Sequence, residues 1–179
     1  MPTLKTLQQV SEYDILPFYT WSGALPVNKG TVVKIVGSGL MNQALTTIGN
    51  AGAAYNGTYS PRWSVVPQVA TVNSTGDRPI GILLYDGRET DENGEQLKFR
   101  PRKAAEMQCF ISGQAVPIAT RGIFQYSGVS GTVTAGSPVY INNIGELATT
   151  GPADRIVGVA LGSKDANGYV NVKLNFENV

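Results

Sequence analysis

The side chains that most often do chemistry in proteins are almost absent from this sequence. There is no histidine among its 179 residues, so no imidazole is present to act as a general base or a metal ligand. This excludes Ser-His-Asp and Cys-His catalysis, which both need an imidazole to take the proton of the nucleophile. Cys109 is the single cysteine and lies in a strand-like run, where we expect a packed, unreactive thiol.

Carboxylates are the remaining candidates for catalysis, and they gather in residues 86–103. Acidic side chains come first in this segment, basic ones follow, and Asn93-Gly94 lies between them. Two carboxylates held across a cleft can hydrolyse a glycosidic bond. We expect instead an exposed hairpin in which an acidic strand faces a basic strand, since Asn-Gly favours a two-residue turn. The sequence therefore assigns no catalytic residue.

The basic half of this predicted hairpin is a candidate contact surface. Lys98, Arg100 and Arg102 alternate, so on a strand they share one face. Such a face either stays solvated and paired with the neighbouring acids or docks on an acidic protein surface. Contact with nucleic acid is the least favoured alternative, because the adjacent carboxylates would repel phosphate.

Motifs for a metal or a cofactor are also missing. The segment 165–168, Asp-Ala-Asn-Gly, begins like a calcium loop but lacks the later ligands and the closing glutamate, so we expect a β-turn there. The segment 37–39, Gly-Ser-Gly, lacks the lysine spacing of a phosphate loop. We therefore predict no metal and no cofactor.

The composition favours one soluble domain, or one domain with an arm. The 14 basic and 13 acidic residues give a net charge of +1, which creates no field that attracts nucleic acid or an anionic membrane. Only 15% of the residues are charged, against about 25% in a typical soluble domain, which fits a surface partly covered by a partner. We recognise neither a signal peptide nor a membrane span, and expect folding in a reducing cytoplasm.

Short β-branched runs bounded by turn residues predict an all-β fold, a small β-barrel or β-sandwich. The 21 glycines and 10 prolines are spread along the chain and leave little room for long helices. Helical turns are considered only at residues 4–10 and 41–48. Strands are predicted over residues 31–36, 79–85, 107–111, 115–119, 123–126, 139–141, 155–161 and 169–174.

Residues 1–25 differ from the rest because their bulky side chains follow no clean period. We expect an irregular N-terminal arm that either closes one end of its own domain or reaches a neighbouring subunit. A first β region with a long insertion and the charged hairpin follows over residues 26–104, and a C-terminal β-domain over residues 105–179. The arm residues taken as contact candidates are Tyr13, Leu16, Phe18, Tyr19 and Trp21.

A repeated phrase suggests an internal duplication. Residues 77–84 and 154–161 share Asp-Arg, a β-branched residue, glycine, a second β-branched residue and leucine. Each phrase has a strand upstream that follows a glycine, Gly30 or Gly136. The mid-strand glycine of each phrase marks a bulge or a close approach of another backbone. A duplication would carry a long insertion in its first copy, and the alternative is convergent patterning in a β-rich chain.

Four short segments of the C-terminal half resemble the small β-domains of tailed-bacteriophage capsid decoration, or cement, proteins. The resemblance runs from about residue 105 to residue 179. Its centre is a Gly-x-Pro-Val-Tyr strand motif, followed by a Val-Gly-Val-Ala strand and a Gly-x-Val-x-Val strand. The four segments are residues 110–115, 133–140, 155–160 and 168–174.

The resemblance implies a non-enzymatic virion protein that binds the outside of an icosahedral head after expansion and ties neighbouring capsid subunits together. It implies the major capsid protein as partner, a homo-oligomer with a trimer favoured, and a place on the outer capsid surface after synthesis in the host cytoplasm. We expect the arm to matter more than the basic face. Buried apolar area contributes about 25 cal/mol per Å², whereas exposed ion pairs contribute little. Deletion of residues 1–21 should therefore weaken assembly more than neutralising the three basic residues.

Two other classes of function stay open. A carbohydrate-binding or adhesin-like module on a virion fibre would use exposed aromatic rings such as Trp21, Tyr59 and Trp63. A cytoplasmic enzyme would have to work with carboxylates alone. Binding to glycans would favour the first class, and hydrolysis that is lost on mutating one acid would favour the second.

Overall fold

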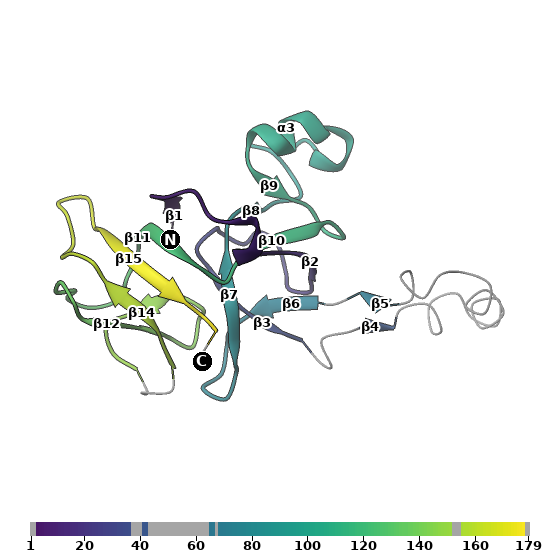
Figure 1. Cartoon of the computed structure of the whole chain (residues 1–179). Helices are drawn as coiled ribbons and strands as arrows, with labels where there is room; N and C mark the ends of the chain where they lie inside the picture. The colour runs from purple at the N-terminus through teal and green to yellow at the C-terminus, as the bar shows by residue number, and fades with distance from the viewer. Residues whose placement is uncertain (1–2, 37–40, 43–64, 67, 152–154, 178–179) are drawn as a thin grey trace.

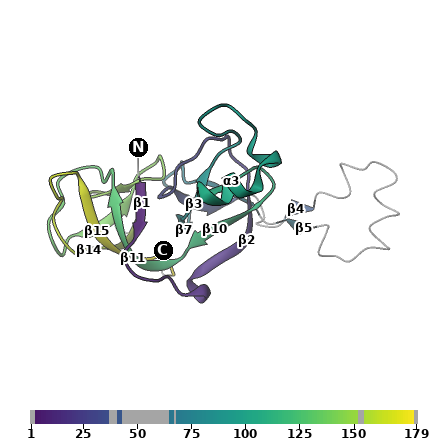
Figure 2. The same ribbon diagram turned by 90° about the horizontal axis from the view of Figure 1, so that it is seen from above.

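The computed structural model describes residues 3–36, 41–42, 65–66, 68–151 and 155–177. They form two β-rich units side by side, with a helical insertion on the first unit and a short two-stranded ribbon beyond it (Figure 1, Figure 2). The expected all-β class with a small barrel is confirmed. The elements are β1 (Thr3–Thr6), η1 (Glu12–Asp14), β2 (Ile15–Trp21), β3 (Val32–Ile35), β4 (Met41–Asn42), β5 (Val65–Val66), β6 (Gln68–Thr71), β7 (Pro79–Leu83), β8 (Asp86–Gly87), η3 (Leu97–Phe99), α3 (Pro101–Glu106), β9 (Cys109–Phe110), β10 (Ala115–Ala119), β11 (Arg121–Ser127), β12 (Pro138–Ile141), β13 (Leu147–Ala148), β14 (Ile156–Ala160) and β15 (Tyr169–Asn175).

The two units repeat one strand plan. The first unit is a closed barrel in the order β10-β2-β6-β3-β7, and the second is a sheet in the order β1-β11-β15-β14-β12-β13. The strands of each unit are counted here along the chain, from β2 in the first unit and from β11 in the second. In both units the first strand pairs with the last, and the second strand lies between the third and the fourth. The fourth strand also pairs with the last. The parallel pairing of β2 with β6 has its counterpart in a single parallel bridge between Ser130 and Ala148. Strand β1 adds to the edge of the second unit.

The two units also share their register. Val33 of β3 lies opposite Gly81 of β7, and Val139 of β12 lies opposite Gly158 of β14. In both pairs the register shifts at the next residue, which marks a bulge. A Cβ on either glycine would collide with a backbone carbonyl of the neighbouring strand, β10 or β15. Glycine is needed in each repeated phrase because another backbone passes where a side chain would begin.

The turns that lead into β3 and β12 match as well. Gly30 and Gly136 have φ values of 88° and 81°, which lie in the left-handed region that favours glycine. The N–H of Gly30 donates to the carbonyl of Leu83 at 2.8 Å, and the N–H of Gly136 donates to the carbonyl of Ala160 at 2.8 Å. The internal repeat predicted from the sequence is therefore present in the fold.

Alternate residues of the first unit face two different hydrophobic cores. Val33 and Leu83 point into the barrel, whereas their neighbours Val32 and Ile82 belong to a second core that is shared with the second unit. All four side chains are completely buried. The turn between β12 and β13 packs against β3 at Val32, and the carbonyl of Gly145 accepts the N–H of Val32 at 2.8 Å. The two units are thus joined by core packing.

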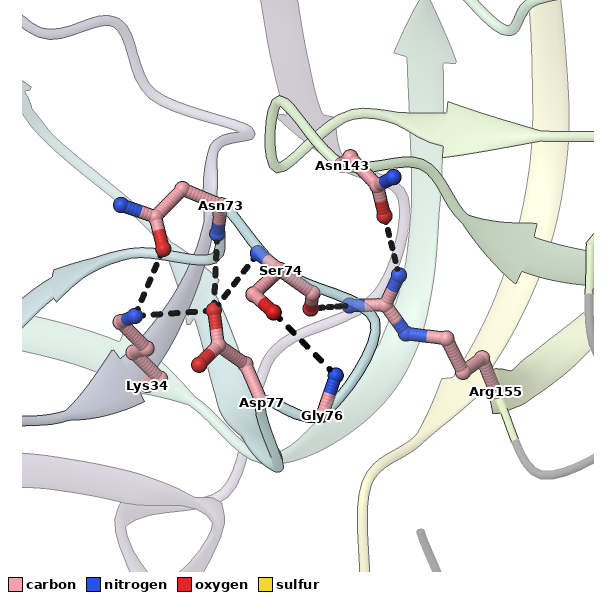
Figure 3. Close-up of polar contacts among 7 residues, drawn as sticks. All are labelled: Lys34, Asn73, Ser74, Gly76, Asp77, Asn143 and Arg155. Carbon is pink, nitrogen blue, oxygen red and sulfur yellow. Dashed lines mark hydrogen bonds and ion pairs between the residues drawn. The ribbon is translucent and has the colours of Figure 1, made fainter.

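Arg155 adds a polar contact between the units (Figure 3). It is only 2% exposed, and one Nη donates to the carbonyl of Ser74 at 2.8 Å, in the turn between β6 and β7. The other Nη donates to Oδ1 of Asn143 at 2.9 Å. Asp77 closes the turn by accepting its N–H groups and a bond from Nζ of Lys34 at 2.8 Å. The buried guanidinium of Arg155, in the second unit, is therefore hydrogen-bonded to a turn of the first unit.

Two expectations for the N-terminal segment are wrong. Residues 4–10 do not form a helix, because Thr3–Thr6 is strand β1 and pairs with β11. Residues 1–25 are not an irregular arm, because β2 is part of the barrel wall and pairs with β10 on one side and β6 on the other. Of the helical turn predicted at 41–48, Met41–Asn42 is strand β4, and the remainder lies outside the described residues.

Candidate functional site

The connection between β7 and β10 carries an insertion, made of β8, η3, α3 and β9. Its own small core is built around Leu97 and Ala104. Pro101 occupies the start of α3, where its missing N–H is not needed and its fixed φ suits a helix. Phe110 anchors the insertion to the barrel, with its ring centroid 6.1 Å from that of Trp21. The insertion is therefore a structured protrusion of the first unit (Figure 1).

An ion pair between a buried carboxylate and a half-buried ammonium fixes the loop of this insertion to α3. The side chain of Asp91 is fully buried, and its Oδ2 lies 2.7 Å from Nζ of Lys103. Its Oδ1 accepts the N–H groups of Asn93 and Glu95 at 2.8 and 2.9 Å. The Lys103 ammonium and these N–H groups lower the pKa of Asp91 to about 2. The carboxylate is therefore charged at neutral pH and holds the loop closed.

The predicted hairpin with a basic strand is wrong. Lys98 belongs to η3, Arg100 lies between η3 and α3, and Arg102 belongs to α3. The predicted Asn-Gly turn is present, with Gly94 at a φ of 81°, but the chain then turns into helix because Pro101 has no N–H for a strand ladder. All three basic side chains are exposed and lie on the same protrusion.

Phe99 is a surface residue that the sequence pattern did not single out. It is 77% exposed and lies in η3 beside Lys98, whose Nζ is 5.0 Å from the centroid of the ring. On the predicted strand it would have faced away from the three basic residues. The signal in the sequence was a lone aromatic residue within a charged segment followed by Pro101.

The arm candidates separate into core and surface residues. Trp21 is 7% exposed and lies in the barrel core, against which Leu16 and Tyr19 also pack. Tyr13 is 97% exposed and lies in η1. Phe18 belongs to β2, but its side chain is outside the described set. Deleting the whole segment would remove β1 and β2, so that deletion tests folding as well as contact.

The acidic residues do not form a metal site in the part of the chain that is described. No three carboxylate, thiol or imidazole groups come close enough there to hold a metal ion. A cavity of about 510 Å³ beside the insertion is lined in part by Arg88, Asp91 and Glu92. Lys103 pairs with both carboxylates, and Arg88 donates to Asn28. Arg88, Asp91 and Glu92 are therefore already paired within the protein.

The single cysteine and one of the aromatic sugar-binding candidates are buried. Burial raises the pKa of the Cys109 thiol, which agrees with a packed cysteine. The ring of Trp21 is in the barrel core, and Tyr59 and Trp63 lie outside the described residues. Within the described ranges, no helix has the length and apolarity to cross a membrane.

A family sequence model described as structural cement protein (E217 gp24/Pam3 gp6) matches residues 22–175. The chain belongs to this family of phage structural cement proteins. The match includes most of both β units, so the resemblance extends well beyond the C-terminal half. The family is described by a structural role in the phage capsid. Comparison of this cement protein with curated proteins gave no match.

Proposed function

We propose that this cement protein binds the outer surface of a phage capsid and bridges neighbouring capsid subunits, and so stabilises the expanded head. The observation that carries the proposal is the family match over residues 22–175. Packaged DNA pushes the capsid subunits apart. A protein that binds two subunits only while their seam is closed stabilises the closed state by mass action. Many copies on a symmetric shell add modest contacts together.

The join between the two units supports a bridging role. A bridge resists stretching only if its own parts do not slide, and close-packed interiors transmit strain because they have few voids. The units share a core that includes Val32 and Ile82, and Arg155 grips the turn at Ser74. Load applied at one unit is therefore carried to the other through packed side chains and not through a flexible linker.

In this proposal the partner is the major capsid protein, and the protein is made in the host cytoplasm before it joins the virion. Self-association into a homo-oligomer, with a trimer favoured, would let one particle engage several lattice sites and gain avidity. The exposed members of the predicted contact set are Tyr13, Lys98, Arg100 and Arg102.

The test uses empty heads of the phage that encodes this chain, in unexpanded and expanded form and free of their own cement protein. The proposal predicts that the purified protein co-sediments with expanded heads and raises the temperature at which they open. Unexpanded heads are the control and should bind little. Absence of binding to expanded heads, or binding without any gain in head stability, contradicts the proposal. Light scattering of the free protein measures its oligomeric state.

A further inference from the structure

The outer face of the second unit carries a row of exposed apolar side chains. Ile156, Val159 and Leu161, in β14 and directly after it, are 40%, 42% and 49% exposed. Strand β14 is not an edge strand, because it lies between β12 and β15 (Figure 1). Val159 lies opposite Pro138 of β12, which is exposed as well. Three of the nine large apolar side chains that are exposed among the described residues therefore gather on one strand and its end.

The equivalent face of the first unit is an interface within the chain. In the shared register, Ile82 takes the place of Val159, and Val32 takes the place of Pro138. Both residues of the first unit are completely buried in the core shared with the second unit. The same strand plan thus already uses this face to pack against protein. Exposed apolar side chains that share one surface are typical of contact sites, because burial would stabilise them.

The charge on the outer face of the second unit has one sign. The six strands of this unit contain Lys5, Arg121 and Lys173 and no acidic residue. Their ladder positions on β11, residues 125, 121 and 123, alternate, so the three side chains share the outer face. Arg121 lies 3.6 Å from Asp14, whereas no described ion pair involves Lys5 or Lys173. The described carboxylates of this unit lie outside its strands, at positions 146, 165 and 177.

A hollow at the edge of this face gives room for a side chain of a partner. Its volume is about 340 Å³, and its lining includes Asp14, Arg121, Ile123 and Lys173. Asp14 is already beside Arg121, which leaves the Lys173 ammonium as the cation of the hollow without a carboxylate in the described ion pairs. An incoming carboxylate would form a charge-assisted hydrogen bond there, which is stronger than a bond between neutral groups.

We infer that the outer face of the second unit, with the β14 row at its centre and Lys173 beside it, docks on an acidic protein surface that has an apolar patch. Two copies of this chain that met through this face about a two-fold axis would bring like charges together, which is unfavourable. A surface with carboxylates around an apolar patch matches both the charge and the row. The inference rests on the proposed function and names its contact: the partner is the exterior of the expanded capsid.

The test measures the Kd for expanded heads by co-sedimentation over a range of protein concentrations. Val159→Asp should raise the Kd at least about 10-fold, because a carboxylate then faces an acidic, partly apolar surface. Val159→Ile keeps a branched apolar side chain and should bind like the wild type. Lys173→Glu should raise the Kd about 10-fold at low salt and less at high salt, because salt screens exposed charges.

Matched control variants carry the same changes elsewhere. Ile144→Asp alters a 64% exposed apolar residue of the second unit that lies in the turn between β12 and β13. Arg78→Glu reverses an exposed charge of the first unit. Both controls should bind like the wild type. All five variants alter exposed side chains and should unfold within a few degrees of the wild-type temperature, measured by thermal unfolding.

The outcomes separate this inference from the proposed function. If the wild type binds and both Val159→Asp and Lys173→Glu bind equally well, the outer face is not the contact, and the inference fails while the proposed function stands. If Val159→Asp changes the solution mass of the free protein and not its binding to heads, the face joins copies of this chain, and the inference fails. If the wild type itself does not bind, both fail.

Discussion

The outward faces of the two units have equivalent backbone positions, but one face is buried within the protein and the other is exposed to solvent. In the shared register, Ile82 corresponds to Val159 and Ala119 corresponds to Lys173. Ile82 and Ala119 are completely buried in the core shared by the units. Val159 is 42% exposed, and Lys173 is exposed on the second unit. The turn glycines and the register determine how the strands pair. The outward side chains determine whether the outer face of a unit packs against protein or is exposed to water.

The insertion is the second difference between the units. The first unit connects β7 to β10 through a protrusion with its own core, whereas the second connects β14 to β15 through a turn at residues 161–168. Short connections follow the strands they join, while a long insertion can be changed without disturbing the barrel. The repeat therefore supplies the scaffold, and the insertion supplies a feature that only one unit carries.

The largest expected effect tests whether the outward faces of the two units differ in burial. Ile82→Ala should lower the free energy of unfolding by about 4 kcal/mol, because it leaves a cavity between the units. Val159→Ala, at the corresponding exposed position, should lower it by less than about 1 kcal/mol. Urea unfolding of both variants measures the difference. Equal losses would mean that the two faces are equally covered in solution.

The next effect concerns the corresponding arginines of the repeated phrases. Arg155→Ala should cost about 3 kcal/mol, because a buried guanidinium and its acceptors at Ser74 and Asn143 lose each other. Arg78 is exposed, and Arg78→Ala should change stability by about 0.5 kcal/mol or less. Thermal unfolding of the matched pair tests this. A loss at Arg78 as large as that at Arg155 would refute the proposed grip between the units.

Smaller losses of stability, similar to each other, are expected at the mid-strand glycines Gly81 and Gly158. Gly81→Ala and Gly158→Ala should each destabilise the protein by about 2 kcal/mol, because the new methyl group meets a backbone carbonyl of the next strand. Gly162→Ala, where a Cβ meets nothing within 4 Å, is the control. Chemical denaturation compares the three. A marked difference between the first two would show that the bulges are not equivalent.

The smallest effect is a pH dependence that arises from Asp91 in the insertion. The folded-state pKa of Asp91, about 2, lies below its ordinary value of 3.8. The stabilisation by this carboxylate is therefore complete above about pH 4 and is lost as the pH falls toward 2. Asp91→Asn should show a weaker loss of stability over that window, measured by thermal unfolding at a series of pH values. An unchanged pH profile would contradict the assignment.

The sequence predicted much of the strand plan, because β-branched runs end at glycine and proline. Residues 115–119 form β10 as predicted, and the repeated phrase revealed β7 and β14. Strand β2 was missed for a physical reason. Pro17 interrupts its alternation, and the pairing of β2 with β10 shifts register between Val116 and Ile118. An irregular strand of this kind is recognised only when its partner strand is known.

The candidate site was predicted less well than the fold. Alternation of Lys98, Arg100 and Arg102 indicated a strand, although Pro101 within that run favours the first turn of a helix. Exposure of Phe99 depends on how η3 packs through Leu97, which the local sequence does not encode by period. Burial of Trp21 in the barrel likewise depends on strands far away in the chain.

Cryo-electron microscopy of expanded heads with the protein added tests the central claim most directly. Density for both β units is expected across the seams between neighbouring capsid subunits. Heads without added density, or density confined to one capsid subunit without contact to its neighbours, would contradict a bridging cement protein.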